Sequence, residues 1–389
     1  MRTAYVLALC AAAILPLHGQ HRRHEVVGYY PSWKWHADSH LLTPGKIPFG
    51  MLTVINYAFF YPLPDGTITG RDSTGDAMIL GPRGGLNTHG SSLTPLAHRS
   101  GVRVLLSIGG WEDSGNFPAV AADSARTVRF AGACGRTIRE YGFDGIDIDW
   151  EFPGLAEHNG TPSDGNNFVR MLRILRDTLD RVGRERRMHL LLSAALPADR
   201  RRAEEMAIRE VAPLLDFLNV MTYDLYGPWD AQAYHNAPLY AGPGADSART
   251  MDGAFRLYHE TLGIPASRIN LGVPFYGHTY TGCTELNGAH GPEDTIHFPR
   301  GGAFYYSIAA QMGHFTKHRD DLAGVPYLTS SAWNMLVSYD DPESVREKAR
   351  YVLDRGARGL IIWEITGDFL PDGSHPLLEA IDGVFRGSH

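Results

Sequence analysis

The residues best suited to chemistry form an acidic octapeptide. Residues 144–151 read Asp-Gly-Ile-Asp-Ile-Asp-Trp-Glu. A β-strand directs alternate side chains to opposite faces, so Asp147, Asp149 and Glu151 are predicted to share one face and Trp150 the other. Because three neighbouring carboxylates cannot all stay ionised in a protected site, at least one retains its proton and has a raised pKa. A carboxylic acid that is protonated near neutral pH can act as a general acid.

Two other interpretations of this octapeptide do not involve catalysis. They are a solvated acidic edge of a strand and a binding site for a divalent metal ion. Asp and Glu are poor strand formers, so three of them on one face with apolar side chains behind them favour a functional site. None of the 18 His forms a His-x-x-x-His pair on a predicted helix with an acidic partner. We therefore expect no metal and no other cofactor.

The octapeptide belongs to a regular series of apolar runs. Eight runs of strand length recur with helical patterns between them: Val26–Tyr30, Leu52–Phe60, Val102–Ile108, Gly145–Trp150, His189–Ala195, Phe217–Met221, Asn270–Phe275 and Gly359–Trp363. Such alternation predicts parallel strands, and eight such units predict an α/β fold, the (β/α)8 TIM barrel. The alternative is a doubly wound open sheet. That fold needs a glycine-rich phosphate turn after the first strand, and Gly28-Tyr29-Tyr30-Pro31 is not one.

Polar and aromatic residues gather where the runs end, at Tyr30, Ser107, Gly109, Gly110, Glu151, Tyr223, Asp224, Tyr276, Trp363 and Glu364. In a barrel, the carboxyl ends of all strands surround one mouth, where active sites are built. About 80 residues separate the seventh and eighth runs, far more than a connection between strand and helix requires. Residues 279–337 are rich in aromatic side chains, which predicts a small α+β insertion that forms one wall of a cleft. Residues 21–389 are thus predicted to form one catalytic unit.

The N-terminal segment has the anatomy of a secretory signal peptide. Arg2 is followed by an apolar run from Ala4 to Leu17 and then by small or polar residues up to Gln20. This run is shorter than the roughly 20 residues that span a bilayer, and no later segment approaches that length. We expect residues 1–20 to be removed, and the protein to be secreted or periplasmic without a membrane partner.

Charge and cysteine content indicate which other partners and cross-links to expect. The formal net charge is -7, and we find no basic patch of the kind that phosphate contacts need, so we expect no nucleic-acid partner. Cys134 lies in a helical pattern and Cys283 follows a predicted strand far away in the sequence. A disulfide in an oxidising compartment is one possibility, but we favour two free thiols. We expect a monomer.

In order and spacing, these motifs resemble those of glycoside hydrolase family 18, the chitinase family. The chain matches four family patterns. It matches Asp-x-x-Asp-x-Asp-x-Glu with Asp144, Asp147, Asp149 and Glu151, and Ser-x-Gly-Gly with Ser107, Gly109 and Gly110. It matches Met-x-Tyr-Asp with Met221, Tyr223 and Asp224, and the Trp of the last strand with Trp363. The resemblance implies a (β/α)8 barrel with an α+β insertion after the seventh strand. It also implies hydrolysis of β-1,4 bonds between N-acetylglucosamine units of chitin or chito-oligosaccharides. Configuration is retained, because the substrate's own 2-acetamido group attacks and forms an oxazolinium intermediate.

The resemblance assigns four catalytic residues. Glu151 is expected to protonate the glycosidic oxygen and then to activate water as a base. Asp149 is expected to hydrogen-bond the acetamido N–H, and Asp147 to share a proton with Asp149 so that Asp149 can turn towards Glu151. These three carboxyl groups are expected to titrate together. Tyr223 is expected to donate its hydroxyl to the acetamido oxygen.

The resemblance also assigns residues that bind the substrate or support the site. Trp363 is expected to form the floor and Asp224 to bond the distorted sugar. Further substrate contacts are expected from Met221, Tyr30, Trp111, Trp229, Tyr276 and His278. Structural support is expected from Asp144, Ser107, Gly109 and Gly110. Without the resemblance, an aromatic residue at the end of an apolar strand is ordinarily a core residue, and Asp224 reads equally as a helix cap.

One position departs from the family pattern. After Pro274-Phe275-Tyr276-Gly277 many relatives carry Arg, whereas this chain has His278. The change replaces a fixed cation by one that titrates. We therefore expect the pH optimum, or the affinity on the non-reducing side, to depend on His278.

Two other functions remain compatible with the fold. Chitinase-like lectins bind chito-oligosaccharides without cleaving them, but they usually lack the acid that is present here as Glu151. An endo-β-N-acetylglucosaminidase cuts the core of N-glycans, whereas the aromatic-rich insertion favours a deep cleft for a linear polymer. A chitinase is therefore the expected function.

Overall fold

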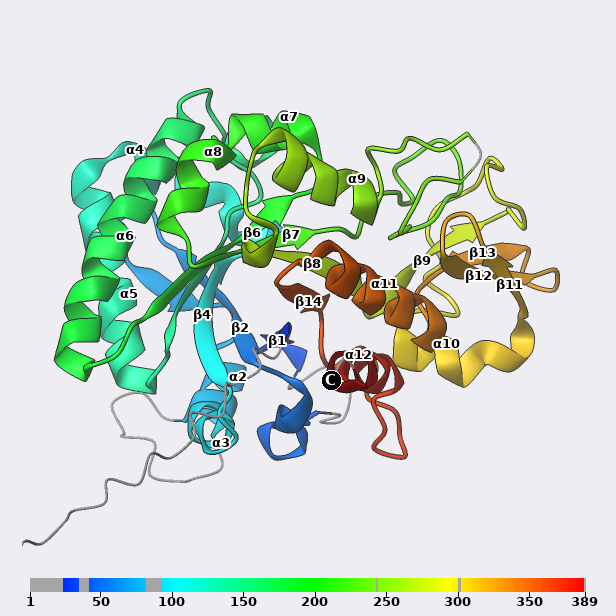
Figure 1. Ribbon diagram of the computed structural model, residues 1–389, viewed down its shortest axis with the longest axis horizontal. Helices are drawn as coiled ribbons and strands as arrows, with labels where there is room; N and C mark the ends of the chain where they lie inside the picture. The colour runs from blue at the N-terminus through cyan, green and yellow to red at the C-terminus, as the bar shows by residue number, and fades with distance from the viewer. Residues whose placement is uncertain (1–23, 35–41, 82–91, 243, 300–301, 388–389) are drawn as a thin grey trace, which may run out of the picture.

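The computed structural model describes residues 24–34, 42–81, 92–242, 244–299 and 302–387. The expected signal peptide, residues 1–20, lies outside the described residues. The centre of the molecule is a barrel of eight parallel strands (Figure 1): β1 (Glu25–Pro31), β2 (Val54–Pro62), β4 (Arg103–Gly109), β5 (Gly145–Asp149), β6 (Leu191–Pro197), β7 (Phe217–Met221), β8 (Ile269–Pro274) and β14 (Gly359–Trp363). β1 pairs with both β14 and β2, which closes the barrel. The prediction of a (β/α)8 barrel is confirmed, and each predicted run overlaps its strand.

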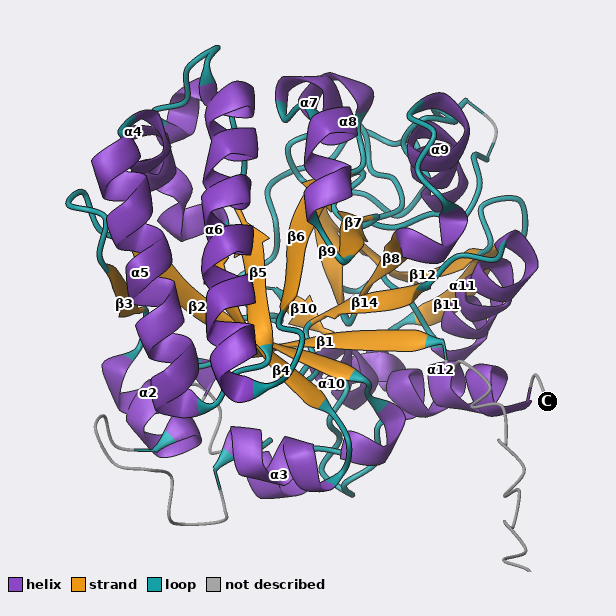
Figure 2. Cartoon of the chain, turned by 60° about the vertical axis from the view of Figure 1, so that its left-hand side comes forward, coloured by secondary structure: helices purple, strands orange, loops and turns teal. Residues whose placement is uncertain are grey.

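Helices surround the barrel because the outward faces of the strands are apolar. They are α2 (Ser73–Leu80), α3 (Leu93–Arg99), α4 (Phe117–Ala122), α5 (Ser124–Tyr141), α6 (Asp164–Arg186), α7 (Arg200–Glu205), α8 (Ile208–Val211), α9 (Met251–Arg256), α11 (Pro342–Arg355) and α12 (Pro376–Gly387). Figure 2 shows α4, α5 and α6 together over the outside of the strands. The main hydrophobic core lies between strands and helices, and a smaller cluster lies inside the barrel.

Local sequence signals set the limits of the longer helices. Asp123 caps α5 by accepting hydrogen bonds from the backbone N–H groups of Ala125 and Arg126. Gly142 ends α5 in the left-handed conformation, with φ of 75°. Asp341 begins α11 with a capping box. These caps fix where the chain leaves each helix and enters the next strand.

An α+β insertion separates β8 from β14. Its antiparallel sheet has the order β10-β9-β13-β12-β11, made by β9 (Tyr276–Thr281), β10 (Ala303–Phe304), β11 (Thr316–Asp320), β12 (Val325–Ser330) and β13 (Met335–Ser338). The helix α10 (Tyr305–Gln311) follows β10. The insertion lies at one end of the molecule, beside the barrel (Figure 1). The predicted insertion is thus confirmed, and only Phe275 separates its first strand from β8.

Two further expectations concern membrane segments and thiols. Within the described ranges, none of the helices combines the length and apolarity needed to cross a membrane. Cys134 and Cys283 are both buried and unpaired. The prediction of two free thiols is confirmed.

Candidate active site

The acidic octapeptide forms β5 and the turn that follows it. Asp147 and Asp149 lie in the barrel interior and are at most 3% exposed. Trp150 faces the helices and stacks on Phe117, with 5.2 Å between ring centroids. The predicted division of the strand into two faces is confirmed. We call Asp147, Asp149 and Glu151 the carboxylate row; it rises from the interior to the mouth.

Asp147, the deepest member of the row, accepts four hydrogen bonds from neighbouring strands. Tyr29 and Ser107 donate to Oδ2 at 2.8 and 2.9 Å. Ser193 and Asn219 donate to Oδ1 at 2.6 and 3.1 Å. Burial raises the pKa of Asp147, and these four neutral donors oppose the rise because they stabilise the ionised form.

Asp149 is buried in a different environment. Its Oδ1 has no hydrogen-bond partner among the described residues. Burial, followed by the charges of Glu151 and Asp147, raises the pKa of Asp149 well above its ordinary value. The contrast with Asp147 indicates that Asp149 is the member of this inner pair that retains a proton.

Two glycines allow β4 and its turn to approach the backbone of Asp149. Gly109 and Gly110 have φ of 118° and 88°, which favour glycine. A Cβ on Gly109 would lie 2.1 Å from the Asp149 carbonyl oxygen, and one on Gly110 would lie 2.4 Å from the Phe59 ring. The Gly110 N–H donates to the Asp149 carbonyl at 2.8 Å. The two glycines therefore fix the backbone beneath the row.

Glu151 is partly buried, and its backbone is held from two sides. Its N–H donates to Ser114 Oγ at 2.9 Å, and its carbonyl oxygen is bonded to His158 Nδ1. Burial, followed by the charge of Asp224, raises the pKa of Glu151 to about 8, while Arg202 opposes this rise. Glu151 is thus a carboxylic acid that keeps its proton at neutral pH.

The insertion supplies a wall beside Asp224. The Tyr276 hydroxyl donates to Asp224 Oδ1 at 2.7 Å, and His278 Nε2 lies 2.8 Å from the same oxygen. His278 Nδ1 lies 3.6 Å from Glu293 Oε1, an ion-pair distance that is too long for a hydrogen bond. Burial lowers the pKa of His278, but Asp224 and Glu293 outweigh this and raise it to about 9. His278 is therefore a cation at neutral pH.

Aromatic rings line the barrel interior next to the row. Trp363 lies 5.4 Å from Tyr29 and stacks on Phe59 at 5.6 Å, between ring centroids. Tyr223 is buried in the same cluster. Burial, followed by the charges of the row, raises the pKa of the Tyr223 hydroxyl, which therefore stays a hydrogen-bond donor.

Three other expected substrate contacts lie near the rim. Trp111 and Trp229 are 43% and 63% exposed. The Trp111 ring lies edge-on to His158 at 4.6 Å, and the Trp229 ring lies edge-on to His278 at 5.2 Å. Met221 is partly buried at the end of β7. The first of these indoles therefore adjoins the row, and the second adjoins the insertion wall.

The predicted substrate contact of Tyr30 is wrong. Its ring is 2% exposed in the core between strands and helices, and its hydroxyl donates to the Leu42 carbonyl at 2.7 Å. Tyr29 faces the row instead, because alternate residues of β1 point to opposite sides. The end of an apolar run therefore does not identify which of two adjacent tyrosines faces the interior.

Asp144 lies at the entry of β5, away from the mouth. Its Oδ2 accepts a hydrogen bond from the Val104 N–H and lies 2.8 Å from His98 Nε2. These contacts join the start of β5 to β4 and to α3. They are the contacts of a structural residue.

Five residues whose side chains hydrogen-bond the row were not predicted: Tyr29, Ser114, His158, Ser193 and Asn219. Ser193 and Asn219 are single polar residues inside apolar runs. A lone polar side chain in a buried strand needs a hydrogen-bond partner, and this signal identifies both. Alternation along β1 separates Tyr29 from Tyr30 but does not show which of them faces inward. Ser114 and His158 lie in short 3-10 helices, Trp111–Asn116 and Ala156–His158, whose paths no local pattern predicts.

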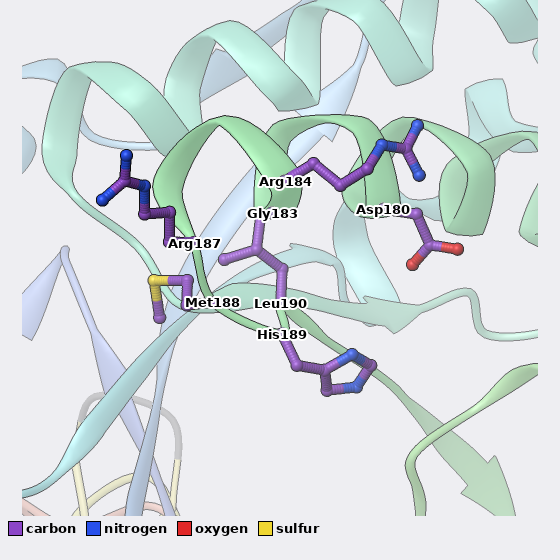
Figure 3. A pocket seen from close by; sticks show the side chains of 7 residues that line it. All are labelled: Asp180, Gly183, Arg184, Arg187, Met188, His189 and Leu190. Atoms are coloured by element: carbon purple, nitrogen blue, oxygen red, sulfur yellow. The ribbon is translucent and has the colours of Figure 1, made fainter.

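A hollow of about 460 Å³ lies at the C-terminal end of α6 (Figure 3). It is lined by Asp180, Gly183, Arg184, Arg187, Met188, His189 and Leu190. Because α6 leads into β6, this hollow lies at the amino ends of the strands, opposite the mouth.

Over the residues that the structure describes, no group of three or more His, Cys, Asp or Glu is placed to hold a metal ion.

Comparison with known proteins gives the family. Residues 25–368 match the model described as glycosyl hydrolases family 18. The chain is 31% identical to Chitinase A1 of Niallia circulans, covering 89% of this chain but only 56% of that protein's length. The catalytic domain 2 of the group II chitinase of Ostrinia furnacalis superposes with a TM-score of 0.82 and 29% identity, covering 94% and 97% of the two chains. A family 18 N-acetylglucosaminidase of Paenibacillus barengoltzii superposes with a TM-score of 0.75 and 28% identity, covering 93% and 99%. Because the family model spans most of its length, the chain belongs to glycosyl hydrolase family 18.

Proposed function

We propose that this protein is a chitinase that hydrolyses β-1,4 bonds between N-acetylglucosamine units of chitin or chito-oligosaccharides with retention. The observation that carries the proposal is the graded environment of the carboxylate row. Asp147 is surrounded by neutral donors, Asp149 is buried with a raised pKa, and Glu151 reaches the mouth as a protonated acid. The row thus offers a single acid and its partners, which suits a substrate that supplies its own nucleophile.

In the first step, Glu151 protonates the glycosidic oxygen while the acetamido carbonyl oxygen of the same sugar attacks the anomeric carbon. The bond to the leaving sugar breaks, its electron pair stays on the departing oxygen, and an oxazolinium ion forms. Glu151, now a carboxylate, then takes a proton from the water that opens the oxazolinium. Two inversions at the anomeric carbon give net retention.

Asp149 stabilises the positive charge that develops on the acetamido group. It turns towards Glu151 and accepts the acetamido N–H, while Asp147 takes the proton that Asp149 carried. The four donors around Asp147 hold its carboxyl group in place during this exchange. The three groups titrate as a unit.

Other side chains orient the sugar. Tyr223 donates its hydroxyl to the acetamido oxygen and directs it at the anomeric carbon. Trp363 forms an apolar floor beneath the sugar ring. Asp224, held by Tyr276 and His278, bonds the distorted sugar. Trp111, Trp229 and Met221 extend the site to neighbouring sugars.

His278 has a role in pH dependence that follows from its contacts. Because the pKa of His278 is about 9, it carries a positive charge over the neutral range, as an Arg would. We therefore expect a His278→Arg variant to differ from the wild type in the pH dependence of activity near and above pH 9. Below that pH the imidazolium holds Asp224 in position.

We further propose that the protein is exported and acts as a monomer. Residues 1–20 direct export and are then removed. N-terminal sequencing of the mature protein is expected to give a start near residue 21, and light scattering is expected to give the mass of one chain. A mature protein that keeps residues 1–20 would contradict the proposal that these residues are removed during export.

The test is the action of the purified protein and of Glu151→Gln on chitin oligomers and on an N-glycoprotein. The wild type is expected to cut the oligomers and to leave the glycans attached. Release of glycans would indicate an endo-β-N-acetylglucosaminidase, and binding without cleavage would indicate a lectin. Glu151→Gln is expected to lose activity by about 100-fold or more, because it removes the general acid but keeps the side-chain shape. Cleavage by this variant at the wild-type rate would contradict the assignment of the acid.

A further inference from the structure

A line of hydrogen bonds runs from Asp147 through the barrel interior to the opposite end of the strands. Asn219 Nδ2 donates to Asp147 Oδ1, and Asn270 Nδ2 donates to Asn219 Oδ1, both at 3.1 Å. Asn270 Nδ2 also donates to Glu25 Oε2 at 3.1 Å. Arg358 Nε and Nη2 lie 2.5 and 3.0 Å from the two Glu25 carboxylate oxygens. We call these five residues the axial chain.

Neighbouring strands supply the middle of the axial chain in adjacent register. Asn219 pairs with Asn270, Asn270 with Gly359, and Gly359 with Glu25. Residues in register on parallel strands point to the same side of the sheet. The Asn270 amide therefore reaches Glu25 across Gly359, which has no side chain to separate them. Asn219 and Asn270 are fully buried, and the Glu25 side chain is 13% exposed.

The axial chain has a direction, because the carboxylates at its two ends can only accept hydrogen bonds while they are ionised. Arg358 holds the Glu25 carboxylate through two charge-assisted hydrogen bonds. Ionised Glu25 requires the nitrogen of the Asn270 amide to face it. The second hydrogen of that nitrogen meets Asn219 Oδ1, so the Asn219 nitrogen faces Asp147. A reversed amide would place an oxygen against a carboxylate in a buried site, which is unfavourable.

We propose that Glu25, Asn270 and Arg358 are positioning residues for the hydrolytic site, because they hold the Asn219 amide in the orientation that donates to Asp147. The donated hydrogen bond favours ionised Asp147 and leaves the proton of the inner pair on Asp149. In the mechanism above, this is the state from which Asp149 turns towards the substrate. The inference rests on the proposed function of the carboxylate row.

The other groups around Asp147 reach it from different directions. Tyr29 donates from β1, and Ser107 and Ser193 donate from the strands on either side of β5. The titratable neighbours are Asp149 on the same strand, Tyr223 beyond the end of β7, and Tyr29 itself. A change at Glu25 leaves these contacts in place, so its effect on Asp147 passes through the axial chain.

The kinetic test compares Glu25→Met, which removes the acceptor of the Asn270 amide, and Asn270→Leu with the wild type on chitin oligomers. Loss of the oriented donor raises the pKa of Asp147, so the acidic limb of the kcat profile is expected to move to higher pH by up to about one unit. KM is expected to stay nearly unchanged, because no substrate contact is altered. Asp216→Asn is the matched control: it disrupts the pairs with Arg176 and His189 at the same end of the barrel, outside the axial chain. It is expected to leave the profile unchanged.

A direct measurement decides the inference without relying on activity. The protein is labelled with 13C at the Asp carboxyl carbons, and the Asp147 signal is assigned with Asp147→Asn. The apparent titration midpoint of the Asp147–Asp149 pair is expected to rise in Glu25→Met. The Glu25 side chain is 13% exposed, so this variant still provides the test if Asn270→Leu does not fold. An unchanged midpoint would overturn the inference. Absence of hydrolysis by the wild type would instead refute the proposed function, and the NMR titration would still decide the role of the axial chain.

Discussion

The barrel interior and the insertion wall hold their carboxylates by different means. In the interior, Asp147 accepts hydrogen bonds from four neutral side chains. At the wall, Asp224 is held by the Tyr276 hydroxyl and by the imidazolium of His278. Neutral donors keep their hydrogens across the working pH range, whereas a His loses its charge as the pH rises. The comparison teaches that the pH-sensitive support of the site lies in the insertion.

Burial explains why the two regions differ. Asp147 is fully buried, and a full positive charge beside it would carry a large desolvation cost. Uncharged hydroxyl and amide groups satisfy the carboxylate at lower cost. The Asp224 side chain is 46% exposed, so water shares the task of solvating the ion pair with His278. The barrel therefore supplies fixed geometry, and the insertion supplies charge.

The largest effect is expected from Asp147→Asn. The variant replaces a carboxylate that accepts four hydrogen bonds by an amide whose nitrogen must face some of the same donors. It also removes the group that takes the proton from Asp149. We expect kcat to fall by about 100-fold or more with little change in KM, measured on chitin oligomers. Ser193→Ala removes one donor only and is expected to cost less than about 10-fold. Equal losses in the two variants would contradict the special position of Asp147.

A smaller effect is expected from Asp224→Asn at the wall. The charge of Asp224 raises the pKa of Glu151, so its removal lowers that pKa. Because Glu151 must be protonated to act, the alkaline limb of the kcat/KM profile is expected to move to lower pH, by about one unit. Asp230→Asn, which weakens the pair with Arg249 in the same loop, is the control and should not move the limb. An alkaline limb that moves to higher pH in Asp224→Asn would be inconsistent with this account.

His278→Gln tests the titrating contact through stability. The folded-state pKa of His278, about 9, lies above its ordinary value, so its stabilising contribution is fully present below about pH 6.5 and is lost as the pH rises through 9. At pH 6 the free energy of unfolding of the variant is therefore expected to be lower than that of the wild type by up to roughly 3 kcal/mol, and its unfolding temperature should be lower too. Above pH 9 this difference in stability should vanish. His278→Arg keeps a cation and should not show this pH dependence. A difference between wild type and His278→Gln that is constant from pH 6 to pH 10 would rule out the titrating contact.

The smallest effect is expected at the exposed rim. Trp229→Ala removes an indole that is 63% exposed, and stacking of one sugar on it is worth about 1 kcal/mol. KM for long oligomers is expected to rise about five-fold while kcat is kept. Tyr240→Ala, at a tyrosine that is 42% exposed and packs edge-on against Tyr351, is the control. If both variants behave alike, Trp229 is not a sugar platform.

Much of the architecture follows from local patterns. The eight apolar runs and the long interval before the last one predict the barrel and its insertion, because strand and helix periodicities are local properties of the chain. The two faces of β5 are predicted for the same reason. Alternation along β1 predicts that Tyr29 and Tyr30 point to opposite sides, but which of them faces the interior is set by the assembled barrel, because both faces of this strand are buried.

Other parts of the site depend on contacts between distant segments. Glu293 meets His278, and Asn270 meets Glu25, only after β8, β9 and β1 have assembled. Charge at such positions has no periodicity that a sequence pattern detects. The pKa of His278 depends on these partners, so its charge at neutral pH cannot be read from its residue type.

The most direct test of the account concerns the nucleophile. Wild-type protein is mixed with chitin pentamer, and the new reducing ends are followed by 1H NMR in the first minutes, before mutarotation mixes the anomers. Attack by the substrate's own acetamido group followed by water predicts that the β anomer appears first. Initial release of the α anomer would mean inversion by direct attack of water, and would contradict the role assigned to the carboxylate row.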